Sequence, residues 1–333
     1  MDINSNLNTL GRLRSSNLFK VAFGFRETSL IIIILLVSSS LSIFSPYFLT
    51  NSNLSSMGIA LVADGIIAIG MTVALVSGNF DLSVGSIMGL ASVVAGTLFL
   101  AGYDIWVACT IAIIAGLTCG LINGFFVGKV GLNPFITTLA MMGIARGVAY
   151  IFTEGSPVSL RGVPEVFRFI GTGSVAGIPF IILLLIGVTL VVDYLMRRSE
   201  PFRKVYYIGS NEKAAILSGI NVTKVKMGVF LLTALLASIA GIIALARFGV
   251  ATPTTGEMAE LRAIAAAVIG GTSLKGGEGS IFGAVLGVLL LAVINNGLVL
   301  LSVSVYWQQF VTFLILLVAV TIDHLSHRKT KTT

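Results

Sequence analysis

Apolar residues occur along the chain in runs long enough to cross a lipid bilayer. A spanning helix needs roughly 20 mainly apolar residues. Nine runs fit this length, at 29–45, 57–77, 84–101, 105–127, 134–153, 177–196, 225–246, 280–301 and 304–322. A tenth, 256–271, is short and polar at its start, so we expect a short or broken helix that its neighbours shield from lipid. The pattern predicts an all-α polytopic membrane protein with about ten transmembrane helices, one of them short or broken.

Composition supports the same class of protein. Of the 333 residues, 56% are hydrophobic and only 11% are charged, whereas a soluble domain carries roughly 25% charged residues. A soluble or disordered chain of this composition is excluded, because it would expose too much apolar surface to water. Membrane lipids are therefore the expected surroundings of most of the chain.

The basic residues indicate how the helices are oriented. With ten spans and both the N- and C-termini cytoplasmic, sixteen of the 21 Lys and Arg residues fall on cytoplasmic segments and two, Arg161 and Arg168, on outside loops. This asymmetry follows the positive-inside rule. It predicts a cytoplasmic segment 1–28, a membrane domain 29–323 and a cytoplasmic tail 324–333. The net charge of +7 is then a topology signal, and we expect no nucleic-acid partner.

Two loops of the predicted membrane domain exceed twenty residues. The periplasmic loop, 154–176, is rich in Gly and Pro. The cytoplasmic loop, 197–224, contains a short helix signal: Ser210 or Asn211 is suited to cap it and Gly219 to end it. A helix of about two turns is unstable alone in water, so it is either a docking element or a connector that rests on the membrane. Neither loop holds a phosphate-binding P-loop, so any ATP-driven transport needs an ATPase on another chain.

Polar residues inside apolar spans are costly and usually functional. Asp81 precedes a helix start, where capping is the simplest explanation. Arg146 is expected to pair with a carboxylate or with carbonyls. The sequence leaves open whether such residues line a hydrated path or hold helices together; the candidates are Asp64, Asn79, Asp81, Asn123, Arg146, Asn295 and Asn296.

The sequence gives little support for a catalytic site, a metal site or a disulfide. No catalytic or metal-binding spacing is visible. Cys109 and Cys119 are ten residues apart in one run, roughly 15 Å along a helix, which is too far for a disulfide. The short repeats Gly85–Gly89 and Gly279–Gly283 indicate either internal duplication or similar small-residue packing.

Several segments together resemble the transmembrane permease of bacterial monosaccharide ABC importers of the ribose and arabinose type. They are SGNFDLSVGS (77–86), PFITTL (134–139) with Arg146-Gly147, GSPV (155–158), GSNEKAAILSGINV (209–222), AAAVIGGTSLKGG (265–277) and NNGL (295–298). Asn79-Phe80 is closer to the arabinose variant of the family, whereas 251–256 and 295–297 are closer to the ribose variant, so the sugar stays open.

The resemblance implies an alternating-access importer in the bacterial inner membrane. Its implied partners are an ABC ATPase subunit that binds ATP and Mg, a periplasmic sugar-binding protein, and a second permease copy or a paralogue; the chain itself is expected to bind no cofactor. The implied ATPase-coupling helix comprises Ser210, Asn211, Glu212, Ala214, Ala215, Leu217, Ser218 and Gly219. An ion-gradient-driven transporter is the main alternative, while a membrane enzyme or receptor lacks a reactive cluster or soluble domain.

Overall fold

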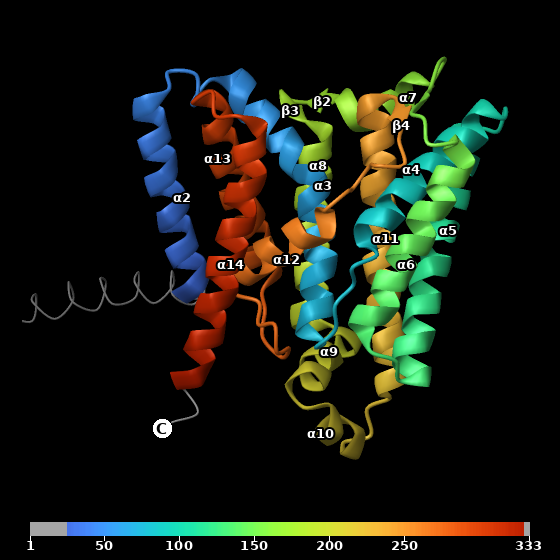
Figure 1. Cartoon of the computed structure of the whole chain (residues 1–333), viewed down its shortest axis with the longest axis vertical. Coiled ribbons are helices and arrows are strands. Elements are labelled where there is room, and N and C mark those ends of the chain that lie inside the picture. The colour runs from blue at the N-terminus through green and yellow to red at the C-terminus, as the bar shows by residue number, and fades with distance from the viewer. Residues whose placement is uncertain (1–24, 330–333) are drawn as a thin grey trace, which may run out of the picture.

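The computed structural model describes residues 25–329, and almost all of the predicted cytoplasmic segment 1–28 lies outside that range. Nine long helices account for most of the described chain (Figure 1). They are α2 (Phe25–Phe44), α3 (Asn51–Val76), α4 (Val84–Leu100), α5 (Ile105–Phe125), α6 (Pro134–Thr153), α8 (Phe180–Arg198), α11 (Val222–Phe248), α13 (Ile281–Leu300) and α14 (Val305–Lys329).

The long helices match the apolar runs of the sequence. Seven helices in the described part of the chain are long and apolar enough to cross a membrane, and two shorter apolar helices, Val84–Leu100 and Tyr306–Val318, accompany them. The chain is therefore an all-α polytopic membrane protein. The weak run predicted at 256–271 forms α12 (Ala259–Ile269), a helix of 11 residues. Most of its residues are buried, and it packs on α3, α13 and α14, as a short segment in lipid requires.

Short elements close the two ends of the helix bundle. At the end opposite α10, the predicted 154–176 loop is folded: it contains β1 (Val158–Ser159), α7 (Glu165–Thr172) and β2 (Ser174–Val175). Strand β1 pairs with β4 (Val250–Ala251), and β2 pairs with β3 (Ile178–Pro179). The opposite end carries α9 (Glu200–Ser210) and α10 (Glu212–Leu217). A five-residue π-helix, Phe126–Val130, extends α5.

Helices α3 and α11 lie at the centre of the bundle, and each packs against helices from the other half of the chain (Figure 1). The two helices pack on each other; α11 also packs on α5 and α4, and α3 also packs on α12 and α13. Both central helices are largely buried. Each half of the chain thus holds the long central helix of the other half.

Glycine allows the closest of these contacts. A Cβ on Gly241 of α11 would collide with the carbonyl oxygen of Met88 on α4, and a Cβ on Gly120 of α5 would lie 2.5 Å from the carbonyl oxygen of Phe230. The helix backbones therefore touch directly, which small residues permit in membrane bundles.

Candidate coupling loop and translocation path

Helix α10 forms at the predicted place in the cytoplasmic loop. The Asn211 side chain accepts a hydrogen bond from the Ala214 N–H at 3.0 Å, so Asn211 is the cap. Ser210 is instead the last residue of α9. Gly219 adopts φ +80° after the helix, and its N–H donates to the Ile216 carbonyl at 3.0 Å. The cap and the terminating glycine were both readable from the sequence because each acts within a few residues.

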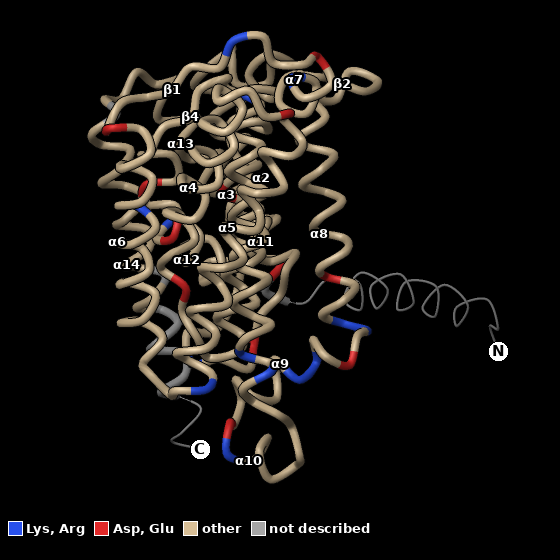
Figure 2. The backbone as a smooth tube through the Cα atoms, turned by 90° about the vertical axis from the view of Figure 1, so that its right-hand side faces the viewer, with Lys and Arg blue, Asp and Glu red and all other residues tan. Residues whose placement is uncertain are grey.

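One ion pair ties α10 to the membrane-spanning part of the chain. The Lys226 ammonium on α11 lies 2.9 Å from both carboxylate oxygens of Glu212. Beyond this pair, α10 projects from the end of the molecule (Figures 1 and 2). Leu217 is 89% exposed and Ile216 is 56% exposed. A helix too short to be stable by itself thus displays apolar side chains outside the bundle, as expected of a docking surface.

At Gly209, near the end of α9, the cytoplasmic loop of the prediction contacts the bundle directly through its backbone. A Cβ on Gly276, which has φ +84°, would lie 3.0 Å from the Cα atoms of both Gly209 and Gly78. The Gly277 N–H donates to the Val76 carbonyl, at the end of α3, at 2.8 Å. We call this contact of Gly78, Gly209 and Gly276 the glycine junction. It joins the end of α9 to the end of α3 and to the loop that precedes α13.

Tyr206 of α9 reinforces the junction from the side. Its hydroxyl donates to the Gly279 carbonyl at 3.1 Å. Burial raises the pKa of this phenol above its usual value, with a further contribution from the nearby Asp193 carboxylate. The hydroxyl therefore keeps its proton, and with it the hydrogen bond, throughout the neutral range.

Of the seven polar candidates from the sequence, Asp81 and Asn123 hold helices together. Asp81 is fully buried in the break between α3 and α4. Its carboxylate accepts from the Ser83 N–H at 3.0 Å and the Ser83 hydroxyl at 2.6 Å, and also from the Thr233 hydroxyl of α11. Asp81 thus supports the start of α4 as predicted, although the cap position itself is Ser83.

The neighbours of Asp81 are equally enclosed. Asn123 is fully buried and donates to the Ser83 hydroxyl at 2.9 Å. Asn79 is also buried and donates locally, to the Ser77 carbonyl at 3.1 Å and hydroxyl at 2.8 Å. We call Asp81, Ser83, Asn123 and Thr233 the closed network. None of these residues lines any of the four cavities found in the described structure.

Arg146 pairs with backbone carbonyls, one of the two kinds of partner that the sequence allowed. Its guanidinium donates to the Thr255 carbonyl at 2.9 Å and to the Pro253 carbonyl. These carbonyls belong to the irregular segment between β4 and α12. Arg146 therefore holds this segment against α6.

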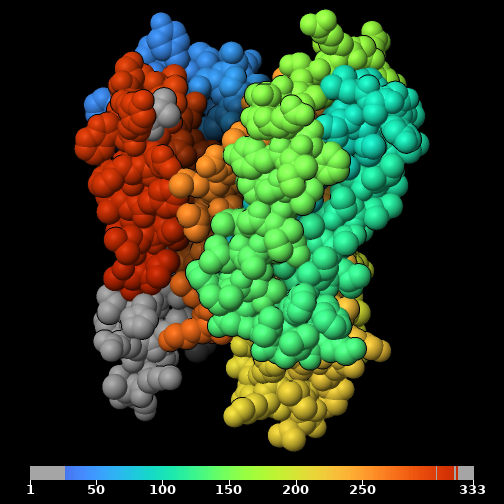
Figure 3. Space-filling model, turned by 45° about the vertical axis from the view of Figure 1, so that its right-hand side comes forward, coloured from blue at the N-terminus to red at the C-terminus, as the bar shows by residue number. Residues whose placement is uncertain are grey.

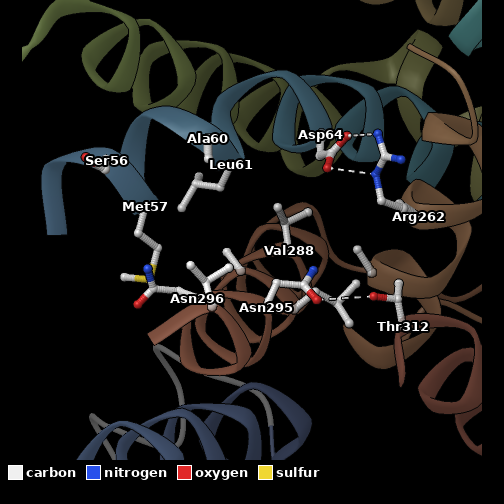
Figure 4. Close-up of a pocket in the computed structure, with 14 residues that line it drawn as sticks. Ser56, Met57, Ala60, Leu61, Asp64, Arg262, Val288, Asn295, Asn296 and Thr312 are labelled. Atoms are coloured by element: carbon white, nitrogen blue, oxygen red, sulfur yellow. Dashed lines mark hydrogen bonds and ion pairs between the residues drawn. The ribbon is translucent and has the colours of Figure 1, made fainter. Parts of the chain in front are cut away.

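Asn295 and Asn296 line a cavity of about 280 Å³ between α3, α12, α13 and α14 (Figure 4). Asn295 accepts from the Thr312 hydroxyl of α14 at 3.3 Å. Asn296 exchanges two hydrogen bonds with Asn53 of α3, at 2.9 and 2.8 Å. Each amide therefore binds a neighbouring helix and also faces the cavity.

The same cavity contains an ion pair that the sequence did not reveal. Arg262 of α12 donates through Nε and Nη2 to the two carboxylate oxygens of Asp64 on α3, both at 3.0 Å (Figure 4). The two residues are 198 positions apart, so no local sequence motif predicted that they would pair. The available signal was a charge inside a span, which did single out Asp64 as a candidate.

Three cavities border this ion pair. Arg262 lines the 280 Å³ cavity, a second of about 510 Å³ beside α14, and a third of about 390 Å³ between α3 and α11. Asp64 lines the first and the third. Between α14 and α6 the surface is hollowed, and atoms of the segment around α12 show at its base (Figure 3). The pair is thus the point at which the three cavities meet.

The described residues contain no group of three or more His, Cys, Asp or Glu side chains able to hold a metal ion. Cys109 and Cys119 are buried and free, which agrees with the spacing argument.

Comparison with known proteins places the chain. Residues 53–320 match the family model described as the branched-chain amino acid transport system / permease component. The chain is 40% identical over 309 residues to the ribose import permease protein of Escherichia coli (strain K12), covering 92% of this chain and 96% of that protein. It is 34% identical over 328 residues to the L-arabinose transport system permease protein of the same strain, covering 98% and 99%.

A third relative, the D-allose transport system permease protein of E. coli K12, is 37% identical over 294 residues, with 88% of this chain and 89% of that protein covered. No solved structure matches the chain. The chain belongs to the family of permease components of transport systems, and it is a multi-pass protein of the bacterial inner membrane.

Proposed function

We propose that the chain is the transmembrane subunit of an ATP-driven importer that carries a monosaccharide, a pentose such as ribose or arabinose, by alternating access. The family description refers to branched-chain amino acids, but the relatives that cover most of the chain are named for ribose, L-arabinose and D-allose. These relatives favour an importer of the ABC type over an ion-gradient-driven transporter. Sugar specificity is shared with a periplasmic sugar-binding protein, because the permease needs only a differential affinity between its two states.

The observation that carries the ATP-driven mechanism is α10. It is capped at both ends, tied by Glu212 to Lys226, and presents Leu217 and Ile216 to the exterior. In our proposal α10 seats in a partner ABC ATPase, which binds ATP and Mg. The coupling residues are Ser210, Asn211, Glu212, Ala214, Ala215, Leu217, Ser218 and Gly219.

The glycine junction supplies a route from α10 to the cavities. Helix α9 continues directly into α10, and Gly209 near its end touches the loops next to α3 and α13. Those two helices line the 280 Å³ cavity. A contact made of backbone has no flexible side chain to absorb motion. A shift of α9 therefore moves the ends of α3 and α13.

The proposed topology has ten spans with both termini cytoplasmic, counting α12 with the nine long helices. A second permease copy, identical or paralogous, covers the hollow beside α14. This proposal rests on the exposed polar residues there, Glu257 and Gln309, which line the 510 Å³ cavity. Polar groups of this kind are too costly to leave against lipid tails.

The test of the coupling assignment uses the substitution Glu212→Lys, which reverses the charge facing Lys226. Transport of D-ribose, L-arabinose and D-allose is measured in proteoliposomes that contain the complex with its ATPase, together with the loaded binding protein. We expect uptake to fall at least tenfold while the amount of permease in the membrane stays unchanged.

Glu200→Lys is the matched control, because Glu200 forms an exposed i,i+4 pair with Lys204 on the neighbouring helix, and such pairs contribute little. Full uptake by Glu212→Lys would contradict the coupling assignment. Sugar uptake that persists without the ATPase but collapses with an ionophore would favour an ion-gradient transporter.

A further inference from the structure

We infer that Asp64 and Arg262, together with Asn295 and Thr312, form the site at which the permease itself binds the monosaccharide during transit. This inference rests on the proposed function and adds a binding site to it. Neither Asp64 nor Arg262 lies in the short motifs that carry the family resemblance in the sequence analysis.

The first support is the place of the pair along α3. Asp64 lies in the middle of this 26-residue helix, and it is the residue nearest the cytoplasmic end of α3 in each of the two cavities that it lines. Beyond it, every residue from 65 to 76 is buried. The cavities therefore end at Asp64 along α3, with open space on the side away from α10 and close packing on the side toward it.

The second support is the hydration of the pair. The side chains of Asp64 and Arg262 are 30% and 33% exposed, although both lie on helices inside the bundle. A purely structural pair at this depth is expected to be sealed from water, as Asp81 is. An ion pair that borders three cavities instead has free positions for a ligand.

The third support is the remaining hydrogen-bonding capacity. Arg262 uses Nε and Nη2 on Asp64, and Nη1 donates to the Glu257 carbonyl at 3.1 Å. Each carboxylate oxygen of Asp64 receives one of these bonds, while a carboxylate offers about four lone-pair positions in all. Two positions thus remain for neighbouring hydroxyl groups of a sugar.

The walls around the pair complete a site for a neutral polyhydroxyl ligand. Asn295 and Thr312 supply an amide and a hydroxyl, and Gln308 of the adjoining cavity supplies a second amide. Met57, Leu61, Val288 and Leu291 provide apolar surface for the C–H faces of a sugar ring. Ligand sites typically combine such apolar walls with a few placed polar groups.

Sugar binding at this site also affects the contact between α3 and α12. Asp64 belongs to α3 and Arg262 to α12, so their ion pair joins two helices across the floor of the cavities. Sugar hydroxyls that donate to the two remaining positions of the carboxylate share its negative charge with the guanidinium. Binding therefore weakens the link between α3 and α12, at the point where the path toward the cytoplasm is closed.

The test measures binding to the permease separately from delivery by the binding protein. Ser56→Cys is introduced after Cys109 and Cys119 are replaced by Ala, because Ser56 is exposed and lines the 280 Å³ cavity without belonging to the proposed site. The complex with its ATPase is labelled by a membrane-impermeant maleimide in the absence and presence of D-ribose, L-arabinose or D-allose. We expect at least one sugar to slow labelling of Ser56→Cys severalfold, and Asp64→Asn to abolish this protection.

Transport by the complete system provides the second readout. We expect Asp64→Asn to lower the sugar transported per ATP hydrolysed at least tenfold. Asp193→Asn is the matched control, since Asp193 pairs with Arg197 on α8 at 2.7 Å and lines none of the four cavities.

A purely structural role of the ion pair predicts a different result for the exchanged pair. If the pair only joins α3 to α12, the double substitution Asp64→Arg with Arg262→Asp restores the link and hence uptake; in a binding site it leaves uptake impaired. Rescue by this exchange, unchanged uptake by Asp64→Asn, or no protection by any sugar would overturn the inference. Loss of ATPase binding or of all sugar uptake by the parent chain would instead contradict the proposed function.

Discussion

Two carboxylates inside the bundle, Asp81 and Asp64, are placed in opposite kinds of surroundings. Asp81 is fully buried, and its partners Ser83 and Thr233 belong to the closed network. Asp64 is paired with a single guanidinium and borders two cavities. A polar residue in a membrane span is therefore not by itself evidence of a transport path. The free hydrogen-bonding positions and the space next to them decide between the two roles.

The largest expected effect separates the two carboxylates by stability. Asp81→Val removes the acceptor of three hydrogen bonds and leaves the Ser83 and Thr233 hydroxyls buried without it. Losing one partner of a buried polar network costs about 3 kcal/mol or more. We expect a sharply lower unfolding temperature of the detergent-solubilised protein, measured by loss of the monodisperse peak after heating. An unfolding temperature equal to the parent's would show that the closed network does not support the bundle.

A smaller difference is expected from two identical substitutions of threonine. Thr233→Val deletes one donor to Asp81 and should cost about 1–3 kcal/mol, because the acceptor is left in a dry site. Thr312→Val deletes a donor to Asn295 that water in the cavity can replace, so its cost should stay below about 1 kcal/mol. Chemical unfolding of both variants in the same detergent compares them directly. Equal losses of stability would remove the distinction between a closed and an open region.

The smallest stability change is expected at Asp64. Asp64→Asn keeps the size of the side chain, and the ion pair is about one-third exposed, so its removal should change stability by less than about 1 kcal/mol. The same variant is expected to lower transport strongly, as described above. A stability loss as large as that of Asp81→Val would place Asp64 among the structural residues.

Local features of the structure were accessible from the sequence. The apolar runs predicted the long helices, and the weak run at 256–271 predicted the short helix α12. Asn211 and Gly219 predicted α10 because caps act within one turn. The sequence placed no helix at Glu200–Ser210, where α9 forms, and it ended the last span at 322, whereas α14 continues to Lys329.

The division of the polar residues was not accessible, because it depends on contacts between distant segments. Asp64 meets Arg262 across 198 positions, and Asp81 meets Thr233 across 152. All of these residues are charged or polar groups in apolar runs, so the sequence alone ranks them equally. Only the packing of α3, α11 and α12 decides which carboxylate is enclosed and which borders a cavity.

Because α3 and α11 each pack against the other half of the chain, the order of synthesis determines when the bundle can assemble. Helix α3 leaves the ribosome early, yet its main partners, α11, α12 and α13, all follow residue 221. At roughly 5–20 residues per second, the Asp64 side chain waits about 10 to 40 seconds for Arg262. The first half of the chain therefore has no finished core of its own, and the membrane domain folds as one unit after nearly all of it has been inserted.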